Sequence, residues 1–440
     1  MTLTSTDRQI LHIALPSIVS NITVPLLGLV DVAIVGHLGS AAYIGAITVG
    51  GMLFNMAYWL FAFLRMGTSG LTAQAYGRGD RAETVRVLVR ALGVALAIGV
   101  ALVALSRPVA DVAFRLIPCS PEVEASARVY FALLVWGAPA VLGLYGFAGW
   151  FVGMQNARFP MAVAITQNVV NIVASAALVF GLGWQVEGVA AGTLIAQYAG
   201  LLMAVAGWWR GYRADTRGVS LRPVTDRAAL SRFFAVNRDI FLRTLCLIAV
   251  TVCFTSSGAA AGDTVLAANA LLMQLFMLFS YVMDGFAYAG EALAGRYVGA
   301  ADAAGFRRTV RRLFGWGLVL AVAFTLAYGA GGRTFLSLLT SETSVVDMAM
   351  AYLPWAVAVP LTSFAAFLFD GIFIGATATG RMLLAMAVAS SVFFISYYLL
   401  TDTLGNHALW LAFLAYLGAR SGVEALCHRA VAARVGRQSS

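Results

Sequence analysis

The sequence predicts an all-α membrane protein, with twelve transmembrane helices in two parallel six-helix repeats that form two lobes around a central cavity. Three observations support this fold class. The first is composition, because hydrophobic residues make up 61% of the 440 residues and charged ones only 11%, with a mean hydropathy of +0.85. Soluble globular proteins carry roughly 25% charged residues. The other two observations are a regular series of long apolar segments and an internal repeat.

Long apolar segments occur twelve times along the chain. Windows of about 20 apolar residues, the length that crosses the hydrocarbon core of a bilayer, are centred near residues 24, 58, 97, 140, 170, 197, 248, 279, 321, 360, 390 and 418. The first segment contains an aspartate and lacks a small-residue cleavage site. We therefore expect it to stay in the protein rather than to be removed as a signal peptide.

The arginines define the orientation and the domain boundaries. All 29 basic residues are arginine, and they cluster after the second, sixth, eighth and twelfth apolar segments, at 78–90, 210–238, 307–312 and 420–437. These positions lie on one side of the membrane, so the positive-inside rule predicts that both termini are cytoplasmic. The expected parts are an N-terminal lobe over 1–209, a cytoplasmic linker over 210–238 and a C-terminal lobe over 239–440.

An internal repeat relates the two halves. Residues 147–153, Phe-Ala-Gly-Trp-Phe-Val-Gly, return 222 positions later as residues 369–375, Phe-Asp-Gly-Ile-Phe-Ile-Gly. Tyr130 matches Tyr352 at the same offset. Six segments per half give both halves the same orientation, which makes the repeat a parallel one. In membranes this architecture is typical of transporters whose binding site lies between the repeats.

The motifs of several other functions are absent from the sequence. No glycine-rich loop ends in Gly-Lys-Ser/Thr, so a P-loop does not supply ATP energy. No His-Glu-x-x-His or Cys-x-x-Cys occurs, and the four histidines are far apart. We therefore predict no enzymatic activity, no metal site, no cofactor and no nucleic-acid partner. Secondary transport driven by an ion gradient is the function that remains.

Asp31 is the strongest candidate for the coupling residue. It lies in an otherwise apolar stretch near the middle of the first segment, where a charged side chain costs roughly 2.5–3.5 kcal/mol on insertion scales. Removal from water favours the protonated acid, so a proton and a cationic substrate can compete for this carboxylate. The alternative is a structural hydrogen-bond acceptor. Pro25 weakens the helix six residues earlier and is either a hinge or a static kink.

Polar residues on the fifth and sixth segments are candidates for the rest of the binding site. Asn168, Asn171 and Ser175 share one helical stripe, and Thr193 lies on the next segment. These side chains either complete a hydrated pocket with Asp31 or bond between neighbouring helices.

Further intramembrane charges are candidates for a gate. Asp284 and Glu291 lie two turns apart on the eighth segment, and Arg65 lies near the position of Asp284 in the repeat. An ion pair between the halves would be either a gate that breaks during transport or a static contact.

Asp370 stands where the first copy has Ala148. It is either a cation or substrate site in the C-terminal half or a structural group. Asp239 and Arg243, spaced i and i+4, are expected to pair locally.

Several motifs together resemble the multidrug and toxic compound extrusion (MATE) family, in its DinF-type branch. They are Leu29-Val30-Asp31, Gly70-Leu71-Thr72-Ala73-Gln74, Asn237-Arg238-Asp239-Ile240, the stretch 263–269, Met283-Asp284-Gly285-Phe286-Ala287-Tyr288 and the stretch 369–377. The resemblance covers essentially the whole chain. It implies twelve helices in two lobes and cation-coupled export of bulky, often cationic compounds. It also implies that Asp31 is the protonation site, that the first helix bends near Pro25, and that Asn171 and Thr193 surround the acid.

The chain departs from the family pattern at two points. Some relatives carry a second carboxylate where this chain has Ser175, and sodium-coupled relatives use a glutamate in the seventh helix, where residues 244–258 hold no acid. Both differences favour protons over sodium as the coupling ion. The expected protein is a monomeric, proton-coupled antiporter in a bacterial inner membrane that exports lipophilic, cationic compounds.

Two alternatives stay open. One is a sodium-coupled exporter that uses Asp370. The other is a flippase for a lipid-linked precursor, which should line its cavity with several arginines. In the sequence only Arg65 is clearly intramembrane, which counts against a flippase.

Overall fold

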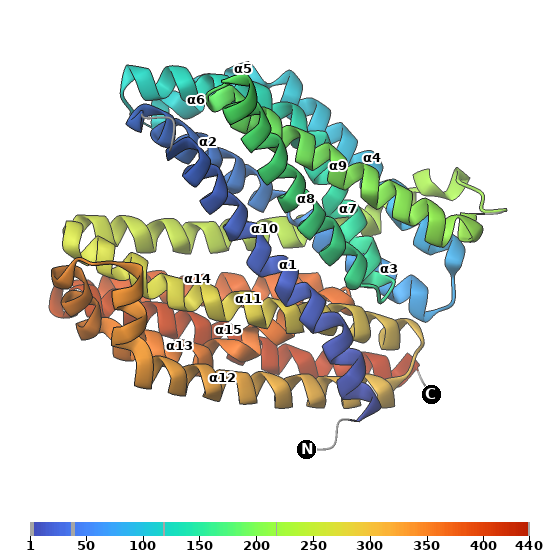
Figure 1. The fold of residues 1–440 in the computed structure, drawn as a ribbon. Helices are drawn as coiled ribbons and strands as arrows, with labels where there is room; N and C mark the ends of the chain where they lie inside the picture. The colour runs from blue at the N-terminus through green and yellow to red at the C-terminus, as the bar shows by residue number, and fades with distance from the viewer. Residues whose placement is uncertain (1–3, 37–39, 118, 217, 439–440) are drawn as a thin grey trace. The chain divides into compact units, whose positions relative to one another are not determined.

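The computed structural model describes residues 4–36, 40–117, 119–216 and 218–438, and these residues form helices joined by short connections (Figure 1). The first half contains α1 (Ser5–Gly36), α2 (Ala41–Leu60), α3 (Phe63–Gly77), α4 (Arg81–Ala104), α5 (Ser106–Leu116), α6 (Pro121–Leu134), α7 (Ala138–Gly153), α8 (Arg158–Ala176) and α9 (Val186–Tyr212). The second half contains α10 (Arg227–Ala260), α11 (Asp263–Gly299), α12 (Ala303–Leu339), α13 (Thr343–Gly375), α14 (Thr379–Leu404) and α15 (Asn406–Gln438).

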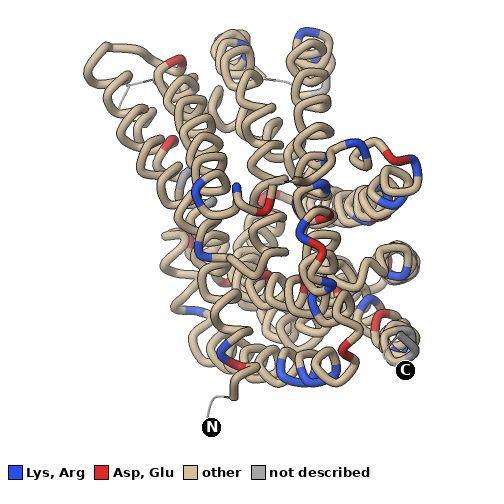
Figure 2. Tube along the Cα trace, turned by 90° about the vertical axis from the view of Figure 1, so that its right-hand side faces the viewer, with Lys and Arg blue, Asp and Glu red and all other residues tan. Residues whose placement is uncertain are grey.

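Helices are the expected form of such a chain, because the bilayer core offers no water to the backbone and a helix satisfies its own N–H and C=O groups. Eleven helical segments of the described residues are long and apolar enough to cross a membrane. Charged residues colour only short stretches of the backbone trace (Figure 2). The eleven segments match eleven of the twelve predicted ones. The twelfth, near residue 418, falls on α15, which contains Arg420 and Glu424.

The chain divides into two compact units. One consists of Val19–Phe234, and the other joins the residues up to Ile18 to those from Ala235 onward. The N-terminal lobe predicted from the arginine clusters was the continuous range 1–209, without a division after Ile18. The first turns of α1 pack on α11, where Gly285 lies against the Ala14 carbonyl and Ile18. This close packing explains why the start of α1 belongs with the second half.

The segment predicted as a cytoplasmic linker, 210–238, includes the end of one helix and the start of the next. α9 continues to Tyr212, and α10 begins at Arg227 after two short 3₁₀ turns, Arg213–Thr216 and Arg222–Thr225. Asp226 stabilises the start of α10 by accepting a hydrogen bond from the Ala229 N–H at 3.1 Å.

In each unit, one of the repeated glycines makes the closest glycine contact with the backbone of a neighbouring helix. A Cβ atom on Gly149 of α7 would lie 2.2 Å from the Arg65 carbonyl oxygen of α3, and one on Gly371 of α13 would lie 2.1 Å from the Ala287 oxygen of α11. Residues 65 and 287 differ by 222, the same offset that relates the glycines. The sequence repeat therefore reports a repeated backbone contact. It also makes Ala287 the structural counterpart of Arg65.

We expect Gly371→Ala to destabilise the protein by at least about 1–3 kcal/mol, the usual cost of overpacking, because the new methyl group would overlap a backbone carbonyl. Thermal unfolding in detergent, followed by size-exclusion fluorescence, measures the effect. Gly315→Ala on α12 is the matched control, since its Cβ would meet no atom within 4 Å. An unchanged melting temperature for Gly371→Ala would contradict the contact.

Candidate functional site

Asp31 lies on α1 and is 6% exposed. The side chains of Asn171 on α8 and Thr193 on α9 contact its carboxyl group. Asn171 Nδ2 donates to Thr193 Oγ1 at 2.8 Å, and the Thr193 hydroxyl in turn donates to the Val189 carbonyl at 2.9 Å. The structure therefore brings the predicted acid and two of its predicted neighbours together. Their role in binding a proton or a substrate stays a prediction.

This site contains more hydrogen-bond acceptors than donors. Among the described residues, Asp31 Oδ1 and Asn171 Oδ1 accept no hydrogen bond, and the Ser175 hydroxyl makes none. Ser175 lies on the same face of α8 as Asn171 and points at α9, where a Cβ on Gly192 would lie 2.2 Å from its Oγ. Buried polar atoms are almost always hydrogen-bonded. A proton on Asp31 would supply a donor to this group.

Asn168, which was predicted to be a binding-site residue, forms its hydrogen bond with the backbone of α1. Its Nδ2 donates to the Thr23 carbonyl of α1 at 2.9 Å, two residues before Pro25. α1 is continuous through Pro25. Asn168 therefore ties α8 to the turn of α1 that the proline weakens, and bending at Pro25 in another conformation stays a prediction.

Tyr130 is a residue near Asp31 that the sequence interpretation did not assign to the site. It lies on α6, is 3% exposed and interacts electrostatically with Asp31. Gly50 of α2 makes room for its ring, since a Cβ there would lie 2.5 Å from Tyr130 Cδ1. The only sequence feature that singled out Tyr130 was its match with Tyr352 in the repeat. Such a match indicates shared structure more readily than shared function.

Asp370 belongs to a buried ionic cluster in the second half of the chain. Arg243 of α10 and Arg420 of α15 both donate to its Oδ2, and Arg420 Nε lies 3.7 Å from Glu424 Oε1. All four side chains are buried, Glu424 completely. We call Arg243, Asp370, Arg420 and Glu424 the ionic cluster. A cation site at Asp370 would have to form beside two guanidinium groups that already neutralise it.

The ionic cluster corrects two expectations. Arg243 does not pair with Asp239, whose carboxylate accepts from Arg238 at 2.9 Å and from the Thr379 hydroxyl at 3.0 Å. The i, i+4 spacing allowed the local pair, but Arg243 turns to a buried acid on another helix. Arg65 is also not alone as an intramembrane arginine, because Arg243 lies on a candidate membrane span.

The predicted gate residues lie on helices of different units. Arg65 is on α3, while Asp284 and Glu291 are on α11. Asp284 Oδ2 accepts from the Ser280 hydroxyl at 3.3 Å, and Glu291 is 1% exposed. An ion pair between the halves stays a prediction.

Comparison with known proteins gives consistent matches over the whole chain. The MatE family model matches residues 16–176 and 240–399. The chain is 40% identical over 420 residues to DNA damage-inducible protein F of Escherichia coli (strain K12), covering 95% of this chain and 91% of that protein. It is 25% identical over 432 residues to Protein DETOXIFICATION 44, chloroplastic, of Arabidopsis thaliana, covering 94% and 80%. The crystal structure of MATE in the bent conformation has the same fold, with a TM-score of 0.88 at 18% identity over 99% of this chain and 97% of that one.

Proposed function

Because this chain belongs to the MATE family, a family of transporters rather than enzymes, we propose that it is a proton-coupled antiporter that exports lipophilic cations. The observation that supports this most is the Asp31 site, where a buried carboxyl group meets Asn171 and Thr193 and keeps one oxygen without a hydrogen-bond partner among the described residues. Such a group binds either a proton or a cation, and that choice is what exchange of the two requires.

The transport cycle follows from this competition. In the outward-open state Asp31 takes up a proton, α1 bends near Pro25 and the substrate leaves. The carrier then turns inward, releases the proton to the cytoplasm and binds a new substrate. A solved protein of the same fold is described in a bent conformation, which supports a bending step. The Asn168 bond to the Thr23 carbonyl would move with the bend.

The proposed setting is a bacterial inner membrane. The arginine clusters favour cytoplasmic termini, with α15 as a twelfth span and two six-helix lobes around a central cavity. The protein works as a monomer in this proposal, and Asn171, Ser175 and Thr193 line the N-terminal part of the cavity.

A proton gradient supplies enough energy for this task. One proton that crosses about 100 mV contributes roughly 2.3 kcal/mol, which sustains about a 50-fold concentration ratio of a neutral solute. Exchange of one proton for one monovalent cation moves no net charge, so transport of that kind would depend on the pH difference alone.

The ionic cluster bears on the two alternatives. A flippase would use arginines to hold a pyrophosphate, and Arg243 and Arg420 are buried, but both of them already bind Asp370. A sodium site at Asp370 would need several oxygen ligands in place of those two guanidinium groups. Both alternatives therefore rank below proton exchange at Asp31.

Transport by purified protein in liposomes tests the proposal. We expect efflux of a fluorescent lipophilic cation when a proton gradient is imposed, and none above protein-free liposomes when only a sodium gradient is imposed. Collapse of the pH difference with nigericin should stop transport. Transport driven by sodium alone would favour Asp370 as the coupling site, and movement of a labelled lipid without a gradient would favour the flippase.

A further inference from the structure

A charged pocket lies within the Val19–Phe234 unit, away from Asp31. It has a volume of about 340 Å³ and is formed by the end of α3, the start of α4 and the start of α10. Its apolar wall consists of Leu71, Val87, Ala228 and Ala229. Its charged lining consists of Arg78, Arg90, Arg232, Asp80 and Glu83. Three guanidinium groups thus face two carboxylates over an apolar wall.

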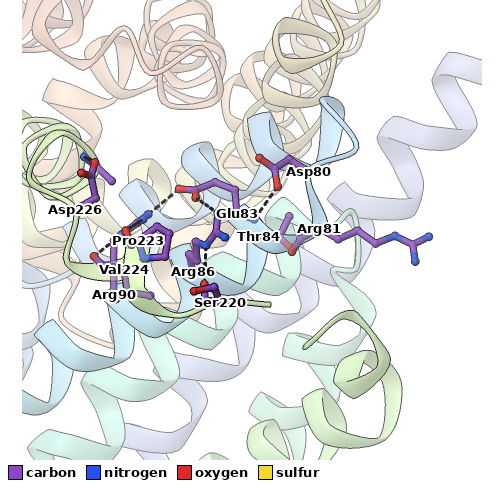
Figure 3. A network of polar contacts seen from close by, with 11 residues as sticks. Asp80, Arg81, Glu83, Thr84, Arg86, Arg90, Ser220, Pro223, Val224 and Asp226 are labelled. Carbon is purple, nitrogen blue, oxygen red and sulfur yellow. Dashed lines mark hydrogen bonds and ion pairs between the residues drawn. The ribbon is translucent and has the colours of Figure 1, made fainter. Parts of the chain in front are cut away.

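Both carboxylates already accept hydrogen bonds from neighbouring groups (Figure 3). Asp80 Oδ1 accepts from the Glu83 N–H at 2.9 Å and caps the start of α4. Glu83 Oε1 accepts from Arg90 Nη1 at 2.7 Å, and its other oxygen lies 3.7 Å from Arg86 Nη1. Arg90 balances the charge of Glu83, and Asp80 keeps its charge, so with Arg78 and Arg232 the lining carries a net charge of +1.

Arg90 connects α4 to the chain segment before α10 at one side of the pocket. Its Nη2 donates to the Pro223 carbonyl at 2.9 Å and its Nε to the Val224 carbonyl at 3.0 Å, so the connection before α10 is fixed against α4. Arg232 donates to Gln74 Oε1 at 2.8 Å, which directs its guanidinium group toward α3. Arg78 is exposed at the end of α3, and within the described part of the chain it forms no ion pair.

We propose that this pocket binds the headgroup of an anionic glycerophospholipid, with its phosphate between Arg78 and Arg232 and its glycerol and first methylenes against Ala228 and Ala229. The location rests on the orientation in the proposed function, which puts the end of α3 and the start of α4 at the cytoplasmic surface. That leaflet carries anionic lipids, which basic pockets between transmembrane helices bind. The apolar wall favours a lipid over free phosphate, because phosphate alone would leave the exposed Ala228 and the half-buried Ala229 in contact with water.

Binding of short-chain phosphatidylglycerol to the purified protein in detergent tests the proposal, with native mass spectrometry as the readout. We expect Arg78→Gln with Arg232→Gln to weaken binding about 30-fold, if each arginine near the membrane surface contributes about 1 kcal/mol. Arg78→Lys with Arg232→Lys should bind nearly as well as the wild type. Arg81→Gln is the matched control, because Arg81 lies on the same turn but points to Asp215 and does not line the pocket.

Three outcomes would overturn the proposal. Phosphatidylcholine could bind as tightly as phosphatidylglycerol, inorganic phosphate or glycerol phosphate could bind as tightly as the lipid, or the double glutamine variant could keep its affinity while its circular dichroism melt matches the wild type. The assay uses no gradient and no transported substrate. A negative result therefore leaves the antiport proposal intact, and a failure of antiport leaves the binding result intact.

Discussion

Asp31→Asn is expected to abolish proton-driven export. The substitution keeps the shape and the hydrogen-bonding reach of the side chain toward Asn171 and Thr193, but it removes the group that exchanges a proton for a cation. The wild type should hold a substrate ratio of up to about 50-fold across a membrane with a driving force equivalent to 100 mV. The variant should fall to the ratio of inverted vesicles from cells that lack the protein. Accumulation of a fluorescent cation in inverted vesicles measures this directly.

Two control variants separate coupling from folding. Asp31→Glu keeps a titratable carboxyl group and should retain part of the transport. Asp111→Asn removes an exposed acid that pairs with Arg128 and should transport normally. Binding of the cation to purified wild type should weaken as the pH falls, since protons compete for Asp31, and Asp31→Asn should lose this pH dependence. Full accumulation by Asp31→Asn would show that another residue couples the ion.

Asp370→Asn is expected to destabilise the protein strongly. The change leaves Arg243 and Arg420 buried without the carboxylate that both of them bind. Breaking a buried ion pair by removing one partner costs about 3–5 kcal/mol. For a unit of roughly 200 residues this corresponds to a melting temperature lower by about 10 °C. Thermal unfolding in detergent or in nanodiscs measures the difference.

The matched control for Asp370→Asn is Asp347→Asn. Asp347 pairs with Arg333 at 2.8 Å, but both side chains are more than 60% exposed, so its loss should cost at most about 1 kcal/mol. If Asp370→Asn melts like the wild type and loses a sodium-dependent component of transport, the ionic cluster is not structural. The cation site predicted at Asp370 would then be the better interpretation.

Much of the secondary structure and one feature of the tertiary structure were predictable. Eleven predicted membrane segments coincide with helices because apolar runs of this length can satisfy their backbone only as helices. The Phe-x-Gly repeat marked Gly149 and Gly371, the points where α7 and α13 touch the backbones of α3 and α11. Asp31 was identifiable because an acid in an apolar segment is costly.

Partner choice was the weak point of the sequence interpretation. Helical spacing showed that Asp239 and Arg243 share a face, yet Arg243 binds Asp370, which is 127 positions away. Arg420 and Glu424 carried no distinguishing signal, since charged residues near a chain end usually lie in water. Asn168 shared a stripe with Asn171, but it bonds the α1 backbone instead of joining the Asp31 carboxyl group.

The sequence by itself determined the class of protein, the positions of its helices, its internal repeat and the acid at the centre of its candidate site, because each of these depends on hydrophobicity and spacing along one chain. Only the tertiary structure decided which helix each polar face meets. That choice set Asn171 and Thr193 beside Asp31 and paired Asp370 with two arginines. It also formed the charged pocket from α3, α4 and α10. The physical reason is that a buried charge takes its partner from whichever helix packs against it, and helix packing depends on side-chain shape across the whole unit.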